Sequence, residues 1–184
     1  MKFRTTAPKR TCNKKYSNYR KYKSHLRSDF NKRCGYTNCP DFWFGGPSAF
    51  HIDHFKPTSK YPELESEYSN LVYCCSYINI LKSNDEGGYL DPCDTDYNKH
   101  FERDNEGYIY PKKGSKKAAY MYHTLQMYLR RYQIIWLLDE LTQRIDKLDD
   151  IIDNNKNVSN AIKNAYFDIN RKFHKYRRFL SVEQ

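Results

Sequence analysis

Two adjacent side chains, an acid and a histidine, begin the part of the sequence that is able to do chemistry. They are Asp53 and His54, and Asn70, Asn79 and Lys82 follow downstream. A carboxylate and an amide oxygen, as in Asp53 and Asn79, are ligands that a hard divalent cation prefers. Histidine exchanges a proton near neutral pH and can therefore take one from an attacking water. These residue types fit hydrolysis of a phosphodiester bond with one metal ion, which would polarise the scissile phosphate.

The elements predicted around these residues decide whether they can meet. Residues 49–56 alternate in the manner of a strand, so the acid and the histidine point to opposite faces of it. Each therefore needs a neighbouring element on its own face. A second short strand over 70–74 and a short helix over 76–83 are candidates for that role. Asn79 and Lys82 are three residues apart on this helix and share one face.

In this order, the Asp-His, Asn-Leu and Asn-x-x-Lys motifs resemble the HNH endonucleases, in their variant with Asp-His, Asn and Asn. The resemblance implies a ββα-metal fold and a metal-dependent hydrolase. It implies that His54 is the general base and that Asp53 and Asn79 bind the catalytic metal, Mg²⁺ or Mn²⁺. Asn70 matches the asparagine that holds the loop between the two strands. DNA is the expected substrate, but these residues do not distinguish deoxyribose from ribose, so RNA such as tRNA stays an alternative.

A narrower resemblance covers roughly residues 20–150. The chain is similar there to the PtuB-like nucleases of Septu and retron-linked anti-phage defence systems. The motifs that carry it are Leu26 and Phe30 before Cys34, His54-Phe55-Lys56-Pro57, Asn70-Leu71, Leu90-Asp91-Pro92, and His100 with Gly107-Tyr108-Ile109. It implies an ATPase partner of the PtuA type on which the nuclease docks. Two alternatives stay open: a non-catalytic module that binds nucleic acid or an ATPase, and a free-standing homing or restriction nuclease.

Two further residues are candidates for substrate contact. His51 lies two residues before Asp53 and so on the same face of the strand. Lys82 lies near the end of the short helix, where its charge would reach a phosphate. The ordinary alternatives are a polar residue at a sheet edge for His51 and a surface charge at a helix end for Lys82.

A structural zinc site is the point at which the sequence departs from the HNH pattern. Many relatives carry two Cys-x-x-Cys pairs, but here the first is widened to Cys34 and Cys39, and the second keeps Cys75 while Ile78 fills the other position. Three thiolates are fewer than the four nitrogen or sulfur ligands of a closed zinc site. Zn²⁺ held by these cysteines, completed by another Cys or a His, is therefore weighed against ordinary buried thiols, which Ile78 favours.

The charge of the chain is concentrated at its ends. The 184 residues carry a formal net charge of +10. Residues 1–33 hold 12 basic side chains and one acidic, residues 34–162 have a net charge of −5, and residues 163–184 have a net charge of +4. Basic surfaces attract the phosphates of nucleic acids. No apolar run approaches the roughly 20 residues that span a bilayer, and no secretory signal is recognisable, so we expect a cytoplasmic protein that does not bind membranes.

The sequence as a whole predicts an α+β protein: a ββα-metal HNH core with a basic N-terminal helix and a C-terminal helical hairpin. We expect a basic arm over 1–13, a nuclease domain over 14–117 and the hairpin over 118–184. Smaller expectations are a leading helix over 14–32, a short strand over 42–44, a β-hairpin of 99–103 with 108–110, a helix over 118–152, a turn at Asn154-Asn155, and a last helix capped by Ser159.

Overall fold

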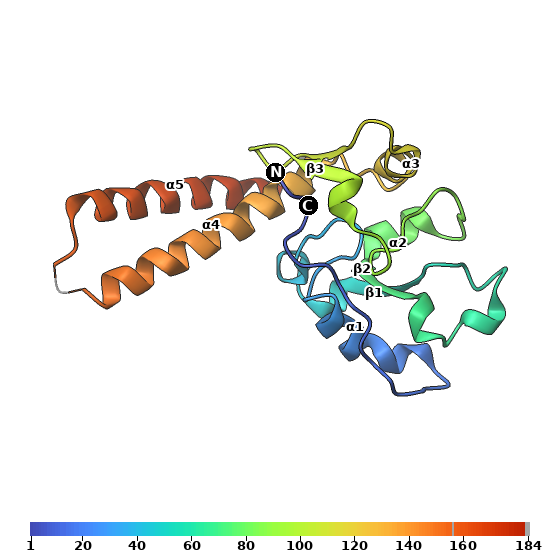
Figure 1. The fold of residues 1–184 in the computed structure, drawn as a ribbon. Coiled ribbons are helices and arrows are strands. Elements are labelled where there is room, and N and C mark those ends of the chain that lie inside the picture. The colour runs from blue at the N-terminus through green and yellow to red at the C-terminus, as the bar shows by residue number, and fades with distance from the viewer. Residues whose placement is uncertain (156, 183–184) are drawn as a thin grey trace. The chain divides into compact units, whose positions relative to one another are not determined.

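A computed structural model describes residues 1–155 and 157–182 of the chain and has an α+β architecture (Figure 1). The helices of this described part are α1 (Lys23–Asp29), α2 (Ser76–Lys82), α3 (Lys116–Thr124), α4 (Arg130–Asp153) and α5 (Asn160–Val182). Its strands are β1 (Phe50–His54), β2 (Leu71–Cys75), β3 (Phe101–Arg103) and β4 (Ile109–Pro111). Within the same ranges, no helix is both long enough and apolar enough to cross a membrane.

The chain forms two compact units, Met1–Leu129 and Arg130–Gln184. The first unit holds both sheets and the helices α1, α2 and α3, and the second holds α4 and α5. The boundary thus falls after α3, whereas the sequence predicts it after residue 117.

The centre of the first unit is the antiparallel pair β1–β2. In its register Asp53 lies opposite Val72 and His54 opposite Leu71. All five residues of β2 are buried, because α1 packs against this strand and α2 packs against both strands. A two-stranded sheet is at best marginally stable by itself, so this covering by helices is what makes the hairpin a rigid platform. The chain passes from β2 directly into α2, in the strand, strand, helix order that the sequence predicts.

The N-terminal residues pack against the body, which corrects the expectation of an arm over 1–13. Phe3 and Arg4 are buried, and the ring of Phe3 contacts those of Tyr97 and Phe101. The Arg4 guanidinium donates to the carbonyl of Gly35 at 2.8 Å. The sequence pattern missed this because one aromatic residue and one arginine, without periodicity, are enough to anchor the segment.

Several elements of the structure are shorter than the sequence predicts, or are turns where it predicts a helix or strand. The leading helix consists of a 3-10 turn over Tyr19–Tyr22 and α1, and the 42–44 strand is part of a 3-10 turn over Asp41–Phe44. In that turn the buried Asp41 carboxylate accepts hydrogen bonds from Arg27 and Tyr73, which favours a turn over a strand. The helix expected over 118–152 is interrupted between α3 and α4, where Gln126 has a left-handed φ of 48°. No glycine or proline marks this break, so the sequence gives no sign of it.

The second unit is the helical hairpin that the sequence predicts. Figure 1 shows α4 and α5 running antiparallel along their length, and the two helices pack against each other. Ser159 caps α5 as expected, its hydroxyl accepting from the backbone N–H of Ile162 at 3.4 Å. The turn predicted at Asn154-Asn155 begins where α4 ends, at Asp153.

Gly35 lies at a close approach in the first unit and provides a test of its packing. A Cβ on Gly35 would lie 2.7 Å from the Phe30 ring and 2.8 Å from the Val72 side chain. We predict that Gly35→Ala lowers the free energy of unfolding by about 1–3 kcal/mol, because the core must shift to accept it. Urea unfolding would measure this. Gly88→Ala is the control, since its Cβ would meet nothing closer than 3.5 Å; equal losses in the two variants would contradict the packing described here.

Candidate active site

His54 is held in one orientation by the backbone of the loop between β1 and β2. Its Nε2 lies 2.9 Å from the carbonyl oxygen of Glu65, and the edge of its ring contacts the ring of Tyr19, with 4.7 Å between centroids. A carbonyl oxygen only accepts hydrogen bonds, so Nε2 carries the hydrogen in this contact. In the neutral ring, Nδ1 then keeps its lone pair and is the nitrogen that can accept a proton.

Asp53 points to the other face of β1, toward α2, and is 3% exposed. One of its oxygens accepts from the Tyr36 hydroxyl at 2.6 Å, and the other accepts from Lys82 Nζ at 3.2 Å. Lys82 is fully buried and donates also to the carbonyl of His54, at 2.8 Å. Burial raises the pKa of Asp53, and the charge of Lys82 and the hydrogen bond from Tyr36 oppose that rise. Tyr36 remains a donor, because burial and the nearby Asp53 raise its pKa well above the ordinary value.

Asn79 is oriented by His51. The amide nitrogen of Asn79 lies 3.4 Å from Nδ1 of His51. This arrangement uses the amide nitrogen as the donor and leaves the amide oxygen of Asn79 without a hydrogen bond among the described residues. His51 pairs with Asn79 and Asp53 pairs with Lys82, so two contacts run side by side between β1 and α2.

Asn70 holds the loop that joins the two strands. Its side-chain oxygen accepts from the backbone N–H of Lys56 at 2.8 Å, and its amide nitrogen donates to the carbonyls of Lys56 and Leu64 at 3.0 and 3.3 Å. These bonds tie the first residues of the loop to its far end. Leu64 precedes Glu65, whose carbonyl holds His54, so Asn70 positions the general-base candidate indirectly.

Several of the candidate residues line one hollow of about 420 Å³ in the first unit. Asp53, His54 and Asn79 all line it, although the first two leave β1 on opposite faces. Its other lining residues are Tyr19, Ile52, Pro57, Thr58, Ile80, Ser83 and Asn84. The hollow thus brings together an acidic, an amide and an imidazole residue. The Asp53 carboxylate itself is turned toward Tyr36 and Lys82.

Lys82 corrects one sequence prediction. It was a candidate for substrate contact or a surface charge, but it is 0% exposed and forms a buried ion pair with Asp53. His51 is exposed and contacts Asn79, and it is not among the residues that line the hollow. Its contact with substrate stays a prediction. Tyr36 and Tyr19, which contact Asp53 and His54, were not found from the sequence, since both lie far from the motif along the chain.

The candidate zinc cysteines Cys34, Cys39 and Cys75 are all buried. Burial opposes ionisation of Cys34, but hydrogen bonds from Cys75 and Thr37 outweigh it and lower the pKa of Cys34 to about 6. Burial raises the pKa of Cys39 to about 11. Within the described part of the chain, no three Cys, His, Asp or Glu side chains converge as metal ligands. The buried thiols therefore fit a closed zinc site poorly, and Zn²⁺ stays a prediction of the resemblance.

The turn between Cys34 and Cys39 is held by hydrogen bonds from two buried arginines. Arg4 donates to the carbonyl of Gly35, and Arg103 donates to that of Thr37 at 2.9 Å. Burial lowers the pKa of Arg103 to about 10. The turn carries Tyr36, so these bonds also support the hydroxyl that contacts Asp53.

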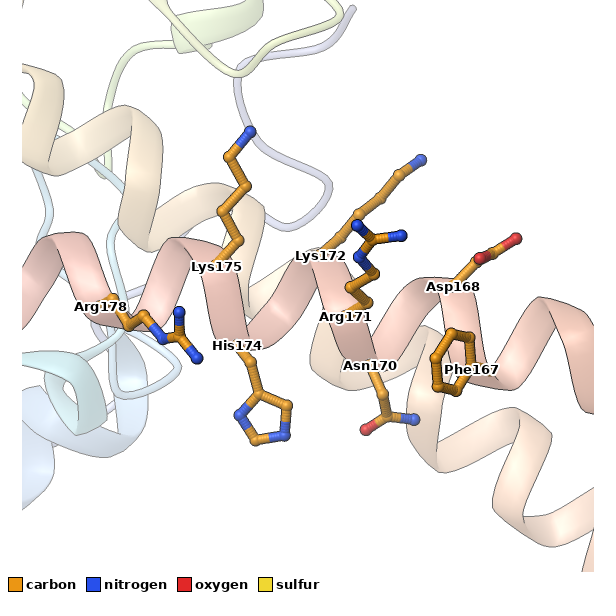
Figure 2. Close-up of a pocket in the computed structure, with 8 residues that line it drawn as sticks. All are labelled: Phe167, Asp168, Asn170, Arg171, Lys172, His174, Lys175 and Arg178. Carbon is orange, nitrogen blue, oxygen red and sulfur yellow. The ribbon is translucent and has the colours of Figure 1, made fainter.

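A larger hollow, of about 890 Å³, lies along α5 in the second unit (Figure 2). All of its lining side chains come from this one helix: Phe167, Asp168, Asn170, Arg171, Lys172, His174, Lys175 and Arg178. Most are basic or polar. The face lacks the combination of carboxylate, amide and imidazole found at the smaller hollow, so size alone does not identify the site.

Comparisons with known proteins found no family model, no curated protein and no solved structure that matches this chain. The candidate site is thus defined by the geometry of its own residues.

Lys82 offers a test of the site's framework. We predict that Lys82→Met lowers the free energy of unfolding by about 3–5 kcal/mol, because it leaves the buried Asp53 carboxylate without its counter-ion. Lys60→Met is the matched control, since Lys60 pairs with Glu86 at the surface with its side chain 59% exposed. This control should leave the urea unfolding curve nearly unchanged.

The double variant Asp53→Asn/Lys82→Met separates the ion pair from packing. It should recover part of the loss, because it buries no unpaired charge. A loss in the double variant equal to the sum of the two single losses would show that the pair is not coupled.

Proposed function

We propose that the first unit is a metal-dependent endonuclease of the HNH type, which hydrolyses phosphodiester bonds of DNA at the hollow lined by Asp53, His54 and Asn79. In this proposal β1, β2 and α2 form the ββα-metal core. The observation that carries it is the contact between Nε2 of His54 and the carbonyl of Glu65. That contact assigns the hydrogen to Nε2 and reserves Nδ1 for accepting a proton from water.

The oxygen donors at the hollow fit one hard divalent cation. A carboxylate offers about four lone-pair positions, of which Tyr36 and Lys82 use two at Asp53. The amide oxygen of Asn79 has no competing hydrogen bond among the described residues. Asp53 and Asn79 would hold Mg²⁺ or Mn²⁺, with water and phosphate oxygens completing the coordination. When bound, the metal supplies polarisation of the phosphate and stabilisation of the leaving oxygen.

Three further residues, Asn70, His51 and Lys82, hold the groups of the site in position. Asn70 fixes the loop that presents the Glu65 carbonyl, and His51 turns the oxygen of Asn79 away from itself. Lys82 ties the backbone of His54 to α2. DNA is the proposed substrate, and tRNA or another RNA is the alternative, because no residue of the hollow is specific for the sugar. The role in anti-phage defence, with an ATPase partner of the PtuA type, stays a prediction of the resemblance.

One observation favours a second function, a non-catalytic module that binds nucleic acid. Both oxygens of Asp53 are already engaged, and one of them faces a buried ammonium. A positive charge at this distance competes with a metal for the carboxylate. In this alternative the Asp53–Lys82 pair serves only the fold, and the protein binds nucleic acid without cleaving it.

A cleavage assay separates the two functions. We predict that the purified protein cleaves DNA in the presence of Mg²⁺ or Mn²⁺ and that EDTA abolishes cleavage. His54→Ala should reduce the rate by about 10²–10⁴-fold, the usual contribution of a general base, while binding of the same DNA is retained. His25→Ala is the matched control, because His25 contacts Tyr16 and does not line the hollow.

The assay is run with the protein alone, on DNA and on tRNA, and again with an ATPase of the PtuA type, the partner that the resemblance implies. Equal rates for the wild type and His54→Ala, under all of these conditions, would contradict catalysis and leave the binding module as the function.

A further inference from the structure

We infer that a basic groove beside the candidate site binds the phosphate backbone of the nucleic-acid strand next to the bond that is cleaved. The inference rests on the proposed function, whose substrate it seats. The groove has a volume of about 570 Å³ and two walls from separate parts of the first unit. One wall belongs to the basic N-terminal segment, with Lys14, Lys15 and Tyr16, and the other to the loop between β1 and β2, with Ser66 and Ser69.

The backbone of the N-terminal wall is fixed by hydrogen bonds. The Tyr22 hydroxyl accepts from the backbone N–H of Tyr16 at 3.0 Å and donates to the carbonyl of Lys14 at 3.1 Å. Across the groove, the Ser66 hydroxyl donates to the carbonyl of Ser17 at 2.9 Å. The two walls are thus joined at one edge, and the lysines project from a segment whose backbone is already ordered. Such preorganisation lowers the entropic cost of binding a ligand.

The charges of Lys14 and Lys15 are available to a ligand. Both side chains are exposed, and neither has an ion-pair partner among the described residues. Other basic residues of the same region differ: Arg10 pairs with Asp91, and Arg27 pairs with Asp41. Two unpaired ammonium groups on a fixed backbone are what an anionic backbone would recognise.

One acidic residue, Glu67, also lines the groove. Its carboxylate has no ion-pair partner among the described residues and would repel a phosphate, so it weakens the site that the lysines create. This residue makes the inference testable in both directions, because removing its charge should strengthen the binding that removing lysine charges weakens.

The groove and the candidate site are lined by different residues, but these come from the same two segments of the chain. Ser66 directly follows Glu65, whose carbonyl holds His54, and Tyr19, two residues after Ser17, lies against the His54 ring. A strand whose scissile phosphate lies at His54 would therefore run next across Ser66 and the two lysines. The basic face of α5 in Figure 2 carries more charge, but it belongs to the other unit and a single helix forms it. Only the groove has a defined position relative to His54.

The test measures binding of a fluorescein-labelled DNA oligonucleotide by anisotropy, in the His54→Ala background to prevent cleavage. Lys14→Gln/Lys15→Gln should weaken binding about tenfold at about 50 mM salt and reduce the slope of log K against log salt by about two. Glu67→Gln should instead tighten binding. Lys116→Gln/Lys117→Gln is the matched control, since it removes the same charge from exposed lysines on α3 and should change neither quantity. Thermal melts establish that each variant is folded.

Cleavage kinetics keep this inference separate from the proposed function. With His54 present, Lys14→Gln/Lys15→Gln should raise KM and leave kcat unchanged. Binding and KM that do not respond to these lysines, in a protein that cleaves, would overturn the groove alone. Binding that follows the three charge changes, in a protein that never cleaves, would support the groove and overturn the nuclease. Equal effects of the groove and α3 variants would overturn the groove, because only net charge would then matter.

Discussion

The buried ion pair between Asp53 and Lys82 is the interaction on which the rest of the site depends. Removing two charges from water costs several kcal/mol each, and their attraction repays this only with good geometry and further hydrogen bonds. Here the Tyr36 hydroxyl and the His54 carbonyl supply those bonds. The pair therefore holds α2 at a defined position along β1. That position brings Asn79, one turn earlier on α2, beside His51 and to the hollow that His54 lines.

Polar cross-links of this kind are needed because the sheets of the first unit are so small. Two two-stranded sheets bury little by themselves, and long connections join them. Buried side chains fix these connections: Asn70 closes the loop after β1, and Arg4 and Arg103 bind carbonyls of the turn at Gly35 and Thr37. Each bond replaces one that the backbone would have made with water, so the loops are ordered without regular secondary structure. The general-base candidate depends on such a loop, through Glu65.

The parts of this arrangement that the sequence predicts are those encoded locally. The strand β1, the short helix α2 and the cap at Ser159 are each predicted from a few neighbouring residues, and each is present in the structure. The partners of the motif are not local. Tyr36 is 17 residues from Asp53 in the chain, and burial of Lys82 depends on the packing of several elements, which no spacing rule contains. A lysine near a helix end is usually solvated, so the sequence argument favoured the surface for a residue that is the buried counter-ion of the site.

The charge of the N-terminal segment also depends on contacts with residues distant in the chain, which the sequence alone does not predict. A net charge of +11 over residues 1–33 suggests a strong attraction to nucleic acid along the whole segment. Yet Arg4 is buried, and the charges of Arg10 and Arg27 are matched by Asp91 and Asp41. Matched pairs contribute little to the field that a ligand meets, so the count overstates the attraction. The unpaired Lys14 and Lys15 lie where the N-terminal segment meets the loop of Glu65 and Ser66. In the proposed function it is therefore the placement of a few free charges beside the loop that contacts His54, more than the total charge, that would direct a phosphate backbone to this part of the first unit.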